Sequence, residues 1–178
     1  IALIKIPKVE LQSGEKVGGL KTNMELIKNP KIMLYFLAIF CYVGLEQGVA
    51  NWMSEFLYTY HQIDPKVGGA SAVSWFWGLL TIGTLLGLVV LKFADSRKVL
   101  MAFTSGAIIC LGIALFGSAQ LSLWAFPMIG FFASVMWSIL ISLALNSVEK
   151  NHGAVSGILV TGICGGAIIP LIIGWIGD

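Results

Sequence analysis

The sequence predicts an all-α transmembrane protein, and three observations lead to that prediction. Of its 178 residues, 57% are hydrophobic and only 11% are charged, whereas soluble domains carry about 25% charged residues. The apolar residues fall into five runs, each near the roughly 20 residues that a helix needs to cross a bilayer. Nearly all basic residues fall on one side of those crossings. The mean hydropathy of +0.90 agrees with this class.

The predicted spans cover about 32–58, 69–91, 99–118, 123–145 and 153–176. Short segments with turn or charge signals separate them: HQIDPK, FADSRK, AQLS and NSVEKNH. Residues 31–178 are therefore predicted to form one transmembrane bundle. Because five is an odd number and nothing after the last span closes the bundle, we expect the chain to be part of a longer protein.

Residues 1–30 are polar and basic, with Pro7 and Pro30 as breaks, and they do not resemble a secretory signal. We expect them in water or along the membrane surface. Ten of the eleven Lys and Arg residues lie on the same side as this segment, and only Lys66 lies opposite. The positive-inside rule then places residues 1–30 and the loops at 92–98 and 147–152 in the cytoplasm.

Glu46 is the only ionisable residue deep inside a predicted span. Counted from Lys31 at 1.5 Å per residue, it lies roughly 20 Å into a hydrocarbon layer about 30 Å thick. A charge there costs several kcal/mol unless it is paired, hydrated or protonated. Two interpretations remain open: a functional acid, or a neutral glutamic acid that is hydrogen-bonded to a neighbouring helix.

The helical wheel separates Glu46 from the other polar residues around it. At 100° per residue, Gly44, Gln47, Gly48, Asn51 and Glu55 form one stripe, and Glu46 lies about 100° from Gln47. Either Glu46 serves a different neighbour, or Gly44 and Gly48 let the helix unwind locally, as in transporters with broken helices. Close packing of a smooth helix through its glycines is the alternative.

Small or polar residues, most of them with a hydroxyl group, follow one face of the second span and one face of the fourth. The two sets are Ser71, Ser74, Gly78 and Thr81, with Trp75 and Trp77 nearby, and Ser134, Ser138, Ser142 and Asn146, with Trp137 nearby. Such groups suit a sugar, because amides and hydroxyls pair with its hydroxyls while an indole covers the apolar face of its ring. Packing, or bonding to their own backbone, is the alternative for Ser and Thr in a membrane helix.

The last span is rich in glycine. Gly153 and Gly157 form a small-xxx-small pair, and Gly162, Gly165 and Gly166 follow, which predicts close helix packing. Gly165, Gly166 and Pro170 predict a kink that a moving gate could use.

Catalytic and metal-binding constellations are not indicated. The three cysteines lie singly in apolar runs, and His61 and His152 have no partner at a catalytic or metal-ligand spacing. The basic loops lack interleaved aromatic residues, so nucleic-acid binding is not indicated either. We therefore expect no enzyme activity, no metal and no cofactor.

Three motifs carry a family resemblance: YVGLEQGVANW, KFADSRKVL and GICGGAIIPLIIGWIGD. They resemble helix seven, the loop between helices eight and nine, and helix eleven of the fucose permease-like sugar:proton symporters of the major facilitator superfamily. The resemblance covers nearly the whole chain. It implies the C-terminal helical bundle of a twelve-helix transporter, with helices seven to eleven present and residues 1–30 linking the two halves.

The resemblance also implies a function. It suggests sugar uptake of the fucose, glucose or galactose type, coupled to protons by alternating access, in the plasma membrane (the inner membrane of a bacterium). The N-terminal half would be the missing partner and would carry the proton-coupling acid, so the resemblance makes Glu46 a poor candidate for the sole proton carrier.

The resemblance also suggests particular site residues. Glu46 and Asn51 are the expected sugar contacts, with Gln47 behind them, and Trp75, Trp137 and Ser138 complete the expected site. The expected hinge residues are Gly48, Gly165, Gly166 and Pro170. Asp95, Arg97 and Lys98 are either a cytoplasmic gate lock or a plain topology signal. The rival interpretations are a membrane assembly or receptor-like bundle without transport activity and, less favoured, a membrane enzyme.

Overall fold

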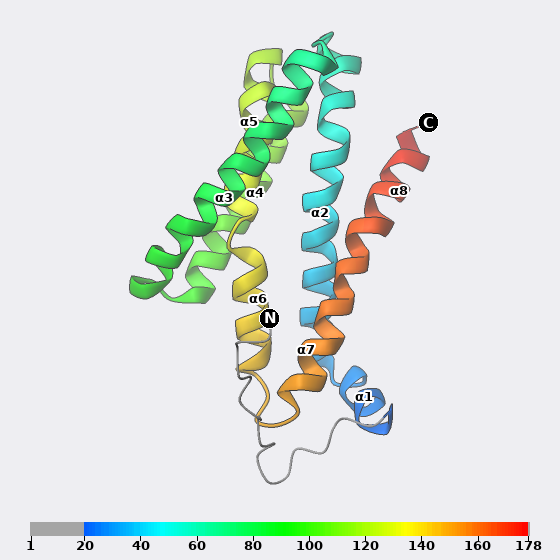
Figure 1. Ribbon diagram of the computed structural model, residues 1–178, viewed down its shortest axis with the longest axis vertical. Helices are drawn as coiled ribbons and strands as arrows, with labels where there is room; N and C mark the ends of the chain where they lie inside the picture. Colours follow the sequence, from blue (N-terminus) through cyan, green and yellow to red (C-terminus); the bar gives the residue numbers. More distant parts are fainter. Residues whose placement is uncertain (1–19, 178) are drawn as a thin grey trace, which may run out of the picture.

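The computed structural model describes residues 20–177 as a bundle of helices (Figure 1). The helices are α1 (Leu20–Ile27), α2 (Pro30–His61), α3 (Ala70–Phe93), α4 (Ser96–Phe116), α5 (Ala119–Ala133), α6 (Met136–Leu145), α7 (His152–Thr161) and α8 (Gly165–Gly177), with a π-helical turn at Pro65–Gly69 and a 3-10 turn at Gly162–Cys164. Five segments are long and apolar enough to cross a membrane. The all-α class and the five predicted spans are confirmed.

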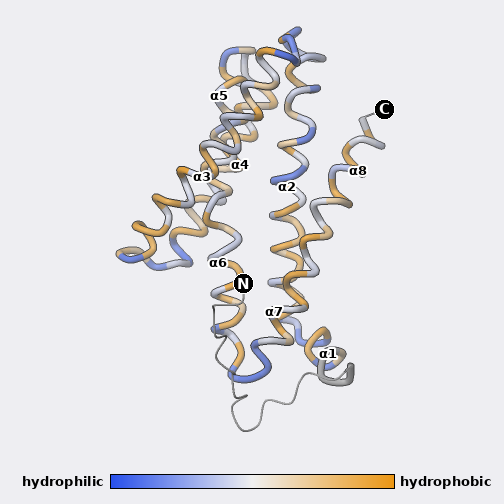
Figure 2. The backbone as a smooth tube through the Cα atoms, in the orientation of Figure 1, coloured by the Kyte–Doolittle hydropathy of each residue, from blue (hydrophilic) through white to orange (hydrophobic). Residues whose placement is uncertain are grey.

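Helix α2 is the centre of the arrangement. It packs along α8 on one side and against α5 and α6 on the other, while α3 and α4 pack on α5 (Figure 1). Hydrophilic residues gather at the two ends of the bundle, and the length between them is mostly hydrophobic apart from hydrophilic stretches on α2 (Figure 2). The end that carries the connections 94–95 and 146–151 is called the inner end below, and the opposite end is called the outer end.

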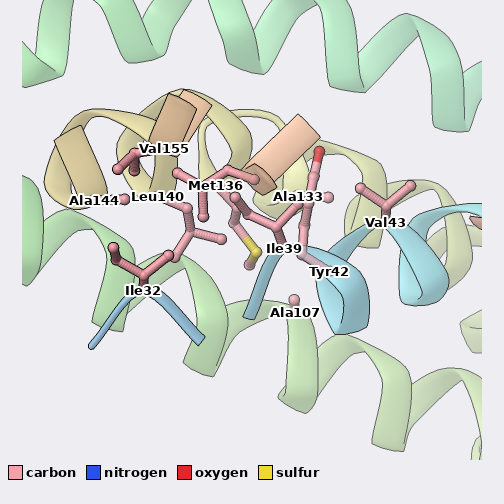
Figure 3. Close-up of a cluster of buried hydrophobic side chains, with 11 residues drawn as sticks. Ile32, Ile39, Tyr42, Val43, Ala107, Ala133, Met136, Leu140, Ala144 and Val155 are labelled. Atoms are coloured by element: carbon pink, nitrogen blue, oxygen red, sulfur yellow. The ribbon is translucent and has the colours of Figure 1, made fainter. Parts of the chain in front are cut away.

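Two apolar clusters fill the space around α2. The inner cluster joins Ile32, Ile39 and Tyr42 to residues of α4, α5, α6 and α7 (Figure 3). The outer cluster joins Val49, Met53 and Leu57 to residues of α3, α4 and α5. Glu46 lies on α2 between the two sets.

Helix α2 is unbroken over its 32 residues. Asn29 caps its start, because its side chain accepts a hydrogen bond from the Lys31 amide at 3.0 Å. The helix ends at Gln62, whose φ of 56° is in the left-handed region that commonly stops a helix. The unwound helix that Gly44 and Gly48 made possible is therefore absent from this structure, and Glu46 serves a different face from Asn51.

The fourth span is not the single helix that the sequence predicted over 123–145. It is interrupted at residues 134–135, between α5 and α6. The Ser134 amide donates to the Phe131 carbonyl at 3.3 Å and the Ser134 hydroxyl donates to the same carbonyl at 2.6 Å. Ser134 thus offers the backbone a local alternative to the helical ladder. The Thr84 hydroxyl of α3 lies 3.4 Å from the Ser134 carbonyl oxygen.

The last span crosses α2 with the two backbones nearly in contact. A Cβ at Gly165 would overlap the Phe40 carbonyl oxygen, and one at Gly162 would lie 3.3 Å from the Phe36 carbonyl oxygen. Glycine is required at the crossing, because any side chain would force the helices apart. By contrast, Gly153 and Gly157, which the sequence marked for packing, have no atom within 4 Å of a Cβ among the described residues.

A 3-10 turn interrupts this span immediately before the residues at which the sequence predicted a kink. The 3-10 turn Gly162–Cys164 ends immediately before Gly165, and α8 then continues through Pro170. A 3-10 segment inside a helix often marks a hinge. The hinge roles of Gly48, Gly165, Gly166 and Pro170 remain predictions.

A buried hydroxyl joins three helix ends at the outer end of the bundle. Ser122 of α5 is completely buried, and its hydroxyl donates to the Ala114 carbonyl of α4 at 2.8 Å. The same oxygen lies 3.1 Å from Nε2 of His61, the last residue of α2. The hydroxyl proton is used on Ala114, so a bond to His61 requires the proton on Nε2.

Of the predicted cytoplasmic segment 1–30, residues 1–19 lie outside the described part of the chain. The described remainder forms α1, which packs against α7 and the start of α2 at the inner end. Its cytoplasmic location remains a prediction.

The crossing of α2 and α8 gives a stability test. We expect Gly165→Ala to lower the stability of the protein in detergent by about 1–3 kcal/mol, because the new methyl group meets backbone. Gly157→Ala in the same span is the matched control, and we expect it to be neutral or to stabilise by about 0.5–1 kcal/mol, since alanine favours helix. Thermal unfolding measures both, and equal effects would contradict the crossing.

Candidate functional site

The middle of α2 carries a hydrogen-bonded pair of polar side chains. The Tyr42 phenol donates to the Glu46 carboxyl, one helical turn further along. Tyr42 is buried in the inner cluster, beside Ile39 and Ala133 (Figure 3), and Glu46 is half-buried. The partner of this carboxyl is on its own helix, and no hydrogen bond from Glu46 to a neighbouring helix occurs among the described residues, so the functional role of Glu46 stays a prediction.

Gln47 lies at the contact between α2 and α8. A Cβ at Gly166 would lie 2.9 Å from the Gln47 Cγ atom and 2.9 Å from a Val43 methyl group. Gly44 and Gly48 face Ile169 and Ile173 of α8. Most of the stripe predicted from the wheel is therefore a packing surface, which was the alternative that the sequence left open.

Asn51 and Glu55 are the exposed members of that stripe. Asn51 lies ten residues before His61, about 15 Å below the outer end of α2. Its neighbours have partners: Trp52 bonds to Pro170, and Glu55 accepts from Thr59. Within residues 24–177 the Asn51 amide makes no side-chain hydrogen bond, so it is free to bind a ligand.

The structure separates the other predicted sugar contacts. Trp75 is 55% exposed near the outer end of α3. With Ser71 and Ser74 it lines an open hollow of about 570 Å³, to which Lys66 also belongs. Trp137 packs against the inner cluster, and Ser138 beside it is exposed. Trp75 follows the outer start of α3 by five positions, and Trp137 precedes the inner end of α6 by eight, so the two indoles do not face one site.

A contact that the sequence did not predict joins α2 to α8 near the outer end. The Trp52 indole N–H donates to the Pro170 carbonyl oxygen at 3.0 Å. A Cβ at Gly174 would lie 2.6 Å from the Trp52 ring, so this glycine provides space for the indole. The two residues are 118 positions apart, and no local pattern signals their contact.

Asp95, predicted as part of a gate lock, caps a helix. Its carboxylate accepts from the Arg97 amide at 2.9 Å and from the Lys98 amide at 3.3 Å, at the start of α4. The Arg97 and Lys98 side chains are exposed. Helix capping explains why an aspartate stands at position 95 even if it has no role in a gate. The gate role of Asp95, Arg97 and Lys98 remains a prediction.

No group of three or more His, Cys, Asp or Glu residues that could hold a metal occurs among residues 20–177. The three cysteines are free thiols.

Five helical segments long and apolar enough to cross a membrane, two of them interrupted along their length, together with a carboxyl at the middle of α2, define a polytopic membrane protein. The family model described as Major Facilitator Superfamily matches residues 3–170. The chain belongs to this superfamily.

Curated relatives cover almost the whole chain. It is 35% identical over 183 residues to a glucose/galactose transporter of Brucella abortus, an alignment that spans 99% of this chain and 43% of that protein. It is 27% identical to a putative glucose/galactose transporter of Helicobacter pylori, over 99% of this chain and 42% of that protein. The chain thus spans less than half the length of these relatives.

Solved structures show the same fold. The fucose:proton symporter of E. coli superposes with a TM-score of 0.83 and 22% identity, over 99% of this chain and 44% of that one. The same kind of transporter in its outward conformation gives a TM-score of 0.81. The likeness at this identity establishes the arrangement of helices, and the predicted C-terminal bundle fold is confirmed.

Two substitutions separate a cap from a charge lock at Asp95. We expect Asp95→Ala to lower stability by about 1 kcal/mol, because the amides at the start of α4 lose their acceptor. Asp95→Asn should stay close to wild type, since asparagine caps as well without a charge. Thermal unfolding in detergent and an uptake assay check both, and loss of uptake in Asp95→Asn at full stability would support the lock instead.

Proposed function

We propose that this chain forms the C-terminal half of a proton-coupled sugar transporter that works by alternating access, with glucose or galactose as the substrate. The observation that carries the proposal is the 35% identity with a glucose/galactose transporter over 99% of the chain. The fold shared with a fucose:proton symporter supports coupling to protons. The relatives are about twice as long, which supports a second helical half as the partner.

The geometry favours Asn51 as the sugar contact from α2. It is exposed and free to hydrogen-bond, whereas Gln47 is packed on α8 and the Glu46 carboxyl is held by Tyr42. In a regular helix, Asn51 and Glu46 point about 140° apart, so one sugar does not bridge them. Trp75 and Ser71 would contribute to an outer part of the same path, and Trp137 and Ser138 to an inner part.

A transporter needs no catalytic group, and the transporter relatives argue against an enzyme. A bacterial inner membrane, with residues 1–30 in the cytoplasm, fits the relatives' organisms and the positive-inside pattern.

Uptake into vesicles tests this function. Vesicles with the full-length protein should accumulate labelled glucose or galactose when the outside is more acidic, because inward proton flow drives the sugar. Collapsing the gradient with a protonophore should reduce accumulation to equilibration. A panel of other sugars tests selectivity, and the absence of any sugar flux above protein-free vesicles would refute the proposal.

The sugar contact is tested by Asn51→Ala. We expect the KM for the transported sugar to rise about tenfold with little change in Vmax, because one hydrogen bond to the substrate is lost. Gln120→Ala removes an exposed amide at the start of α5 and is the control, with an unchanged KM. Equal KM values for Asn51→Ala and wild type would exclude the contact.

A further inference from the structure

Glu46 lies at the middle of α2 with no basic side chain at its depth. It is fifteen residues from Lys31 and fifteen from His61, so about 22 Å of helix separates it from each end. Every basic residue of the described chain lies at a helix end or in a connection. A carboxylate at this depth therefore has no countercharge within the described bundle, and a permanently charged state is costly.

The titratable groups on the surrounding helices are few. On α2 itself the near ones are Tyr42 and the exposed thiol of Cys41, and Glu55 lies more than two turns outward. Helix α4 offers the half-buried thiol of Cys110, and the last span offers the exposed thiol of Cys164. Helices α5 and α6 contain no titratable side chain, and the only one on α3 is Lys92 at its inner end.

Tyr42 fixes the position of this carboxyl. Its ring is held in the inner cluster by residues from α4, α5 and α6, so the phenol is a rigid donor rather than a mobile one. The Tyr42–Glu46 pair lies at the same depth in the bundle as the interruption of the fourth span. Ala133 and Met136 flank that interruption at residues 134–135, and both pack in the same cluster as Tyr42. Movement of α5 against α6 would thus reach Tyr42 and, through it, Glu46.

We propose that Glu46 is a proton-binding site of the transport cycle, in addition to the acid expected in the N-terminal half, with Tyr42 as its positioning residue. This inference rests on the proposed proton-coupled transport. The Glu46 carboxylate takes one proton from water on the outer side and becomes a neutral carboxylic acid. The bundle can then close to the outside and open to the inside without a charge in its apolar interior. When the bundle opens inward, the O–H bond breaks and the proton leaves to cytoplasmic water, restoring the carboxylate. The phenol of Tyr42 stabilises the charged form by donating to it and keeps its own proton throughout.

The test compares two assays in proteoliposomes that contain the full-length protein. Accumulation driven by an acidic outside needs protonation and deprotonation, whereas counterflow at equal pH exchanges sugar without net proton movement. Glutamine mimics the protonated carboxyl. We expect Glu46→Gln to reduce accumulation by about tenfold or more while counterflow stays within about threefold of wild type. Glu149→Gln, in the exposed inner loop, is the control and should match wild type in both assays.

Tyr42→Phe keeps the carboxyl and removes its donor. We expect the pH profile of accumulation to move to higher pH by about one unit, because the carboxylate has lost its hydrogen bond and holds its proton more firmly. A purely structural role for Tyr42 would lower uptake equally at all pH values and leave the profile in place.

The outcomes separate this inference from the proposed function. If wild-type protein does not accumulate sugar on a proton gradient, the proposed coupling fails. If wild type accumulates sugar and Glu46→Gln does so equally, the role of Glu46 is overturned and the coupling stands. Loss of counterflow in Glu46→Gln together with an unmoved pH profile in Tyr42→Phe would also overturn it.

Discussion

The contact between α2 and the last span is the constraint on which the rest of the bundle depends. At Gly165 the two backbones approach so closely that no side chain fits between them, and at Gly162 an added Cβ would lie tightly against Ile39 and the Phe36 carbonyl oxygen. From that crossing α8 runs along the glycine face of α2, past Ile169 on Gly44 and Ile173 on Gly48, to the hydrogen bond between Trp52 and Pro170. Because apolar side chains gain little from leaving lipid, such close van der Waals packing is what holds membrane helices together.

This packing decides which faces of α2 remain for function. One face is used by α8, and another by the two apolar clusters with α4, α5 and α6. Asn51 remains exposed, and Glu46 is left between the clusters with Tyr42 as its partner. Two neighbouring spans are interrupted in mid-membrane, at residues 134–135 and at Gly162–Cys164. Interruptions of this kind are tolerated where nearby groups satisfy the freed backbone, as the Ser134 hydroxyl does here.

The sequence predicted the five spans because their apolar length and their charged connections are local signals. It also predicted that Glu46 leaves the polar stripe if the helix is regular, but it could not decide whether Gly44 and Gly48 unwind that helix. The Tyr42–Glu46 pair could have been predicted by the same argument, because a spacing of four residues brings side chains together on a helix.

The Trp52–Pro170 bond could not have been predicted, since no local pattern links residues 118 positions apart. The interruption at 134–135 carries neither glycine nor proline. The sequence marked Gly153 and Gly157 for packing together with Gly162 and Gly165, and only the position of α2 decides which of them lie at a helix crossing. Counting from the helix ends would have shown that Trp75 and Trp137 lie at different depths.

The central claim, that this bundle belongs to a sugar transporter driven by protons, is tested most directly by the proton movement itself. A lightly buffered suspension of de-energised vesicles with the full-length protein is given a pulse of glucose or galactose, and the external pH is recorded. The account predicts a transient alkalinisation that scales with the sugar taken up and disappears with a protonophore. Sugar entry at the same rate with no change in external pH would contradict it.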